Sequence, residues 1–228
     1  MKNQSVGLNR ALFQCKTFDS GSLGVLSAIY HRFADPGDYD LLVTTGGQVA
    51  RRMHVHVAKD DAPEQADLDL AASDSGGCSC GDKQHGLRIR AGGSVCFYAG
   101  TGSRTFAIEA HSRDAKGTQT VLDTSKGLDA GSAFSTTLVR PGRYQATLGH
   151  AKGSVDIHVE MPDPKAKQAP QGEAPLVRVT KEGFDTEKVR VGVGATVFFV
   201  MEHPARVRTE LVKPEHDEDE LWGRKRKD

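Results

Sequence analysis

The sequence has no net charge and few aromatic residues. Its 228 residues include 30 Lys and Arg against 30 Asp and Glu, and aromatic side chains make up 6% of the chain. Balanced charge produces no long-range field that would attract nucleic acid or an anionic membrane surface. Sparse aromatics supply no platform on which nucleic-acid bases could stack. We therefore expect neither a nucleic-acid partner nor a membrane partner.

Long apolar segments are also missing. No window approaches the length that spans a bilayer, and the first ten residues lack the apolar stretch of a secretory signal. As written, the chain is expected to be cytoplasmic, or a fragment of a longer protein. It contains no phosphate-binding Gly-Lys-Ser or Gly-Lys-Thr loop, and no Cys and His arrangement that indicates a catalytic dyad. We therefore expect no enzyme activity.

Four cysteines are too few for a disulfide framework. Cys15 and Cys96 lie in apolar contexts, where we expect small buried thiols. Cys78 and Cys80 lie in a Gly- and Ser-rich stretch with His85 close behind. Thiolates beside an imidazole bind zinc or Cu(I), but this cluster supplies only three ligands. A metal site and a linker without metal both remain open.

The most informative feature that is present is an internal repeat. Residues 87–98 and 189–200 have closely similar sequences at an offset of 102 residues (189 minus 87). A second pair of similar segments, 35–39 and 140–144, recurs at nearly the same offset. Similarity at a fixed period indicates duplicated domains.

The order of the repeated motifs predicts one intact domain and one that is split between the two ends of the chain. The expected segments are a back half-domain (1–58), a linker (59–84), an intact domain (85–161), a second linker (162–174), a front half-domain (175–213) and a charged tail (214–228). We expect 1–58 to pack against 175–213. The halves meet within one chain or by exchange between two chains, which would give a homodimer.

Alternating apolar and polar residues predict an all-β chain. In 154–160 the apolar residues share one face of a strand, and in 53–57 the outward positions are His54 and His56. This pair could chelate zinc or copper, although exposed histidines also occur without metal. Tyr39 and Tyr144 each follow a Pro-Gly turn, where we expect a buried ring whose hydroxyl hydrogen-bonds to backbone.

These motifs resemble the cupredoxins, the plastocyanin and azurin class of β-proteins. The resemblance lies in segments 183–191, 194–199, 128–134, 141–144 and 153–159, with a related back end at 19–22 and 36–39. It implies a Greek-key β-sandwich, with one intact domain and a second one split between the N- and C-terminal segments. Cupredoxins are mostly extracytoplasmic.

The resemblance does not extend to the type 1 copper ligands. The cysteine that the family would place after the turn tyrosine falls at Val43 and Leu148, and the first histidine position falls near 104–105 and 205–207. The implied function is a non-enzymatic, copper-free binding or architectural module without a cofactor and with an unknown protein partner.

Two alternative functions remain. One is a copper- or zinc-binding protein, for metal handling or electron transfer, whose nonstandard ligands are Cys78, Cys80, His85, His54 and His56. The other is an enzyme of the multicopper-oxidase type, which requires several His-x-His pairs, and the sequence has only the pair at His54 and His56.

Overall fold

The described part of the chain is all-β, as the alternation of apolar and polar residues predicts. The computed structural model describes residues 10–72, 86–114, 117–149, 153–161 and 174–216. These residues form one short helix, α1 (Arg10–Phe13), and seventeen strands. Within them, no helix is long and apolar enough to cross a membrane.

The strands are β1 (Thr17–Asp19), β2 (Ser27–Arg32), β3 (Gly37–Thr45), β4 (Gln48–Ala58), β5 (Gln65–Asp69), β6 (Gly86–Arg90), β7 (Ser94–Tyr98), β8 (Ala107–Asp114), β9 (Gly117–Asp123), β10 (Ala133–Leu138), β11 (Gly142–Leu148), β12 (Ser154–Glu160), β13 (Leu176–Thr180), β14 (Gly183–Phe184), β15 (Lys188–Gly192), β16 (Ala195–Met201) and β17 (Val207–Pro214).

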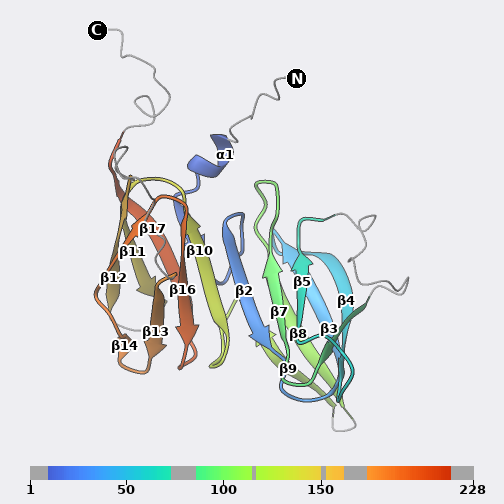
Figure 1. Ribbon diagram of the computed structural model, residues 1–228. Coiled ribbons are helices and arrows are strands. Elements are labelled where there is room, and N and C mark those ends of the chain that lie inside the picture. The colour runs from blue at the N-terminus through green and yellow to red at the C-terminus, as the bar shows by residue number, and fades with distance from the viewer. Residues whose placement is uncertain (1–9, 73–85, 115–116, 150–152, 162–173, 217–228) are drawn as a thin grey trace, which may run out of the picture.

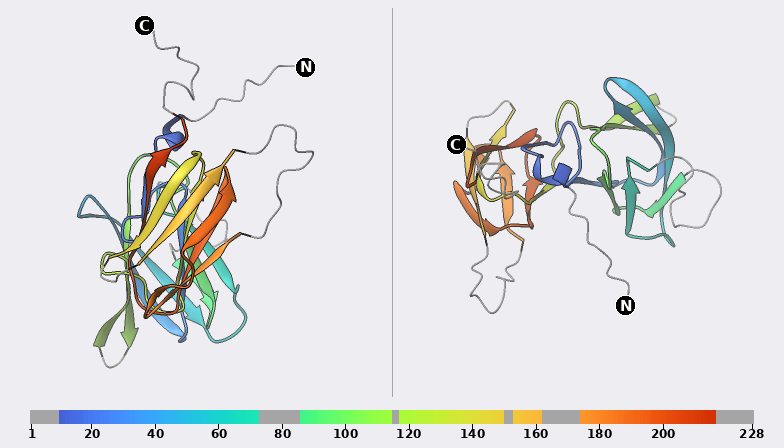
Figure 2. Two further views of the ribbon diagram at one scale, coloured as in Figure 1. Left: turned by 90° about the vertical axis from the view of Figure 1, so that its left-hand side faces the viewer. Right: turned by 90° about the horizontal axis from the view of Figure 1, so that it is seen from above.

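The strands form three sheets. Sheet 1 has the strand order β6-β4-β3-β8-β9, sheet 2 the order β14-β13-β16-β10-β2-β7-β5, and sheet 3 the order β1-β17-β11-β12-β15. Sheet 2 has seven strands and runs through the whole molecule, because β10 and β2 pair in its middle (Figure 1). Seen from above, two groups of strands lie side by side and are joined at this pairing (Figure 2).

The prediction of Greek-key cupredoxin sandwiches is wrong, because the strands wind as a β-solenoid of about three turns. The winding is visible where β4, β5, β6 and β7 follow one another. The chain passes from sheet 1 to sheet 2 and back, so that β6 lies parallel beside β4 and β7 parallel beside β5. In the same way, β15 lies parallel beside β12 and β16 parallel beside β13. The motifs behind the resemblance specify turns and strands, which do not determine the order in which strands pair.

The internal repeat is visible in the register of these parallel pairs. Val55 pairs with Leu87 in sheet 1, and Ile157 pairs with Val189 in sheet 3. Both members of the second pair lie 102 positions after those of the first, which is the offset found in the sequence. The repeated sequence therefore forms the same step of the winding twice.

The terminal segments pair differently from the expected closure of 1–58 against 175–213. Only β1 pairs with a strand of that C-terminal segment, β17. Strand β2 pairs with β10 and β7, β3 with β4 and β8, and β4 also with β6. We therefore name two groups of strands: unit 1 comprises β2 to β9, and unit 2 comprises β1 and β10 to β17. The strands of 27–58 find partners nearer in sequence, which requires closing shorter loops.

Two tyrosines fix equivalent turns of the two units, as predicted. The Tyr39 hydroxyl donates to the Asp35 carbonyl at 2.8 Å, and the Tyr144 hydroxyl donates to the Arg140 carbonyl at 3.0 Å. Tyr144 is fully buried. Burial raises the pKa of its phenol to about 12, against the opposing effect of the Arg140 hydrogen bond.

Two cysteines, Cys15 before β1 and Cys96 of β7, and the histidine of β2 are part of the packing. Cys96 is buried and Cys15 half-buried, and burial raises the pKa of both thiols. His31 of β2 is buried at the junction between the units, with its Nδ1 3.1 Å from the Ser132 hydroxyl. Burial lowers the pKa of this imidazole to about 4, so that it is neutral at neutral pH.

Candidate functional site: a cleft where the two units meet

Of the predicted metal ligands, the structure describes only His54 and His56. Cys78, Cys80 and His85 lie outside the described residues. His54 and His56 point outward from β4, as predicted. Within the described ranges, no group of three or more His, Cys, Asp or Glu side chains could hold a metal ion.

The two histidines are held by carboxylates on the neighbouring strand. His54 Nδ1 lies 2.7 Å from Asp40 Oδ1, and His56 Nδ1 lies 2.8 Å from Asp38 Oδ1. Asp40 also pairs with Arg113 of β8. Both histidines thus have carboxylate partners on the neighbouring strand. The zinc or copper site remains a prediction.

A second polar chain lies on the same sheet. The Thr120 hydroxyl lies 3.2 Å from His111 Nδ1, and His111 Nε2 lies 3.4 Å from a Glu109 carboxylate oxygen. A hydroxyl, an imidazole and a carboxylate in this order are also the groups of a nucleophile, its base and an orienting acid. The His111 side chain is 22% exposed and that of Glu109 42% exposed.

A cleft with a volume of about 540 Å³ lies where unit 1 meets unit 2. Four segments form its walls: β9 with the connection from β9 to β10, the end of β11, the turn after β13 and the connection from β16 to β17. The lining residues are Thr120, Leu122, Asp123, Lys126, Gly127, Asp129, Leu148, Gly149, Thr180, Lys181, His203, Pro204, Ala205 and Arg206.

A backbone bridge joins the two units at this cleft. The Leu128 amide donates to the Ala205 carbonyl at 2.8 Å, and the Ala205 amide donates to the Leu128 carbonyl at 3.0 Å. The preceding residue, Gly127, has a φ of 133°, and a Cβ placed there would lie 3.1 Å from the Ala205 carbonyl. Glycine therefore allows the two connections to approach this closely.

Arg206 joins the same region to two other segments. Its Nε and Nη2 donate to the two carboxylate oxygens of Asp19 at 2.8 and 2.9 Å, and its Nη1 donates to the Ser125 carbonyl at 3.4 Å. These contacts join the β16–β17 connection to β1 and to a connection that leaves unit 1. The hydrogen bonds to Asp19 raise the pKa of Arg206, so the guanidinium stays charged.

Asp123 and Lys126 form a second ion pair on the rim. Lys126 Nζ lies 2.9 Å from Asp123 Oδ2, and Asp123 Oδ1 accepts a hydrogen bond from the Ser125 hydroxyl at 2.6 Å. Burial acts to raise the pKa of Asp123, but the hydrogen bonds from Ser125 and Lys126 outweigh it and hold the pKa below its ordinary value. Both ionised partners are thus fixed in place.

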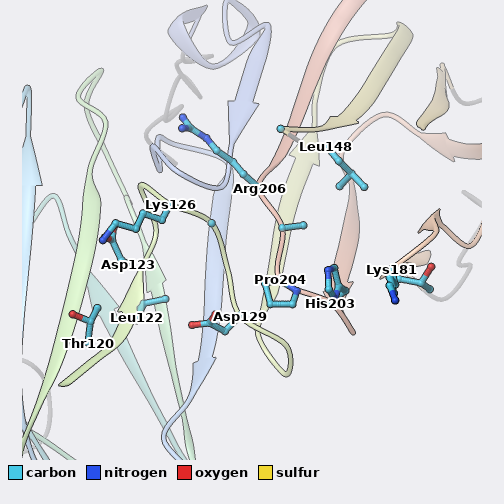
Figure 3. Close-up of a pocket in the computed structure, with 14 residues that line it drawn as sticks. Thr120, Leu122, Asp123, Lys126, Asp129, Leu148, Lys181, His203, Pro204 and Arg206 are labelled. Atoms are coloured by element: carbon cyan, nitrogen blue, oxygen red, sulfur yellow. The ribbon is translucent and has the colours of Figure 1, made fainter. Parts of the chain in front are cut away.

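Three exposed side chains of the cleft remain available to a ligand. Within the described part of the chain, Lys181, His203 and Asp129 have no side-chain hydrogen bond or ion pair (Figure 3). In the close-up, Asp129 and His203 lie on either side of Pro204, and Lys181 lies beyond His203. An anionic group could bind Lys181 and His203, and a donor could bind Asp129.

No pattern in the sequence indicates this cleft. Leu128 and Asp129 belonged to the framework of the resemblance, and His203 was one of several scattered histidines. The cleft depends on the pairing of segments that are far apart in the chain, which no local motif records. Comparison of the chain with protein-family models, with curated proteins and with solved structures finds no match.

Proposed function

We propose that this protein is a non-enzymatic binding module and that its ligand occupies the cleft between the two units. The observation that carries the proposal is that Lys181, His203 and Asp129, all without side-chain partners among the described residues, line one cleft. Ion pairs and a backbone bridge fix the walls behind them. Binding sites commonly lie between two structural units and are largely formed in advance.

The lining favours a short peptide segment of a partner protein as the ligand. The accessible apolar lining residues are Pro204 and Ala205, with the buried Leu122 and Leu148 also in the walls, and charged groups of both signs surround them. A cleft with this combination suits a ligand that has apolar side chains, at least one carboxylate and backbone groups that form hydrogen bonds. The volume of about 540 Å³ accommodates a few residues.

Selection from a random peptide library tests this proposal. Peptides enriched on the wild-type protein should contain acidic residues, because Lys181 and His203 offer positive charge or hydrogen-bond donors. Lys181→Glu should weaken the binding of a selected peptide about tenfold or more, since it places a carboxylate opposite a carboxylate. Lys213→Glu is the matched control, because Lys213 is exposed at the end of β17 and does not line the cleft.

Two outcomes would contradict the proposal. Either no peptide is enriched above an unrelated protein, or the selected peptides bind Lys181→Glu and Lys213→Glu equally well. The second outcome would place the binding surface elsewhere on the molecule.

The chain of Thr120, His111 and Glu109 contains the groups that an acyl-transfer enzyme needs, and such an enzyme is the second candidate function. We propose that these residues instead only connect β8 to β9, because they lie on a part-exposed face where water competes for each group. Hydrolysis of p-nitrophenyl acetate decides between the two. The binding module predicts equal, background rates for the wild type and Thr120→Val, whereas an enzyme predicts a rate above background that Thr120→Val removes.

A further inference from the structure

One face of sheet 2 is buried and the other is part-exposed, although Cys96 and Ser135 on this second face are themselves buried. On β2, Ile29 and His31 are buried, whereas Tyr30 between them is part-exposed. On β16, Phe199 is fully buried and Phe198 is part-exposed. The outer face continues across both units, because β10 and β2 pair at the junction (Figure 1).

A single row of side chains crosses six strands of this outer face. The register aligns them in the order Arg178, Val200, Ala133, Tyr30, Cys96 and Asp67. The row begins with a cation and ends with an anion, and the residues between them are apolar or small. Arg178 is bound to Glu202 at 2.7 Å but remains 61% exposed, and Asp67 is exposed. Both charges remain accessible to another molecule.

The neighbouring row has aromatic residues on both sides of its centre. Phe198 is followed by Ser135, Ala28 and Tyr98 on the next three strands. The rings of Tyr30 and Phe198 lie 5.9 Å apart. Part-exposed aromatic residues grouped over several strands mark an interaction surface.

We propose that this outer face binds a second copy of the chain in a twofold-symmetric dimer. The symmetry axis runs parallel to the strands, between β10 and β2. It sets Arg178 opposite Asp67 of the partner subunit, and Asp67 opposite Arg178 of the partner subunit. It also sets Tyr30 opposite the small Ala133 of the partner subunit. Charge and bulk therefore match under one rotation, as an interface between identical surfaces requires.

The size of the surface predicts a weak dimer. Six strands about 4.8 Å apart give a face roughly 25 Å wide. Two such faces in contact bury on the order of 1,000 Å² in total, which is the low end for specific interfaces. Two sheets can pack face to face in this way with their strands within about 30° of each other. We therefore expect a monomer–dimer equilibrium in the micromolar range.

Sedimentation of the full chain over a range of concentrations, with charge-reversed variants, tests the dimer. Arg178→Asp and Asp67→Arg should each weaken self-association about tenfold or more, because each places like charges opposite one another twice per dimer. An equimolar mixture of the two variants should recover dimers, since both contacts then join an Asp to an Arg. The matched control is Arg208→Asp, which removes the exposed pair of Arg208 with Glu210 on β17.

Ala133→Glu provides an independent test at the centre of the face. It places a carboxylate opposite Tyr30 of the partner subunit and should weaken the dimer about a hundredfold or more. Circular dichroism should show that the variant is folded, because the Ala133 side chain points away from the core. The proposal is wrong if the wild type stays monomeric at high-micromolar concentration, if Ala133→Glu still dimerises as the wild type does, or if the mixed variants stay monomeric.

Discussion

Arg206 holds Asp19 in a two-point ion pair, from Nε to Oδ1 at 2.8 Å and from Nη2 to Oδ2 at 2.9 Å. The two residues are 187 positions apart in the chain, and their side chains are 38% and 18% exposed. Because Arg206 also contacts the Ser125 carbonyl, the pair connects three segments around the cleft.

Arg206→Ala should lower the free energy of unfolding by about 1–2 kcal/mol, because a part-buried, two-point charged pair is lost. Arg208→Ala is the control, since its pair with Glu210 is exposed, and it should change the free energy of unfolding by less than about 0.5 kcal/mol. Urea denaturation measures both. Equal effects of the two substitutions would show that Arg206 does not brace the fold.

Gly127→Ala should destabilise the protein more than Gly131→Ala. Both glycines have positive φ, 133° and 86°, so both substitutions strain the backbone. Only at Gly127 does a Cβ also lie close to another segment, 3.1 Å from the Ala205 carbonyl, whereas nothing lies within 4 Å at Gly131. We expect a loss of about 1–3 kcal/mol for Gly127→Ala and about 1 kcal/mol for Gly131→Ala, measured by urea denaturation. A larger loss at Gly131 would contradict the backbone bridge.

Tyr144→Phe should lower the free energy of unfolding by about 1–2 kcal/mol, because it leaves the Arg140 carbonyl without its 3.0 Å hydrogen bond in a buried place. Tyr39→Phe removes the equivalent bond in unit 1 and should have a similar effect. The wild-type phenol of Tyr144 should also remain protonated in ultraviolet titration until about pH 12. Unchanged stability of both variants would mean that the two turns do not depend on these hydroxyls.

Acid should destabilise the protein partly through His31. Burial lowers the pKa of this imidazole from 6.5 to about 4, so the unfolded chain binds the proton at a higher pH than the folded one. The free energy of unfolding therefore falls as the pH drops from about 6.5 to about 4, by on the order of 3 kcal/mol from this group. His31→Gln should lose this part of the pH dependence, whereas His203→Gln, at an exposed position, should keep it. Denaturation curves for the wild type and His31→Gln that shift equally with pH would refute this explanation.

The sequence predicted the strands and the repeat better than their assembly. Alternation correctly assigned the outward positions of His54 and His56, and the Pro-Gly turns correctly identified the hydrogen bonds of Tyr39 and Tyr144. Strand order depends on contacts between distant segments, which local turns and alternation do not encode, and so the Greek-key prediction was wrong. The offset of 102 residues does match the parallel register, because the pair of Ile157 with Val189 lies 102 positions after the pair of Val55 with Leu87.

The candidate site was less predictable than the fold. Its groups lie in connections from both units, and residues such as Lys181 and Asp129 carry no motif. They line a common cleft only when the bridge between Leu128 and Ala205 brings their connections together. By contrast, His54 and His56, which the sequence did indicate, pair with carboxylates of the neighbouring strand β3.

NMR can show whether a selected peptide binds in the cleft between the units. Amide signals of the full chain are recorded with and without a peptide selected from the library. We expect the largest shift changes on residues 126–129, 203, 205 and 206, and we expect Lys181→Glu to reduce them while Lys213→Glu does not. Shift changes confined to the outer faces of sheet 1 or sheet 2 would contradict it.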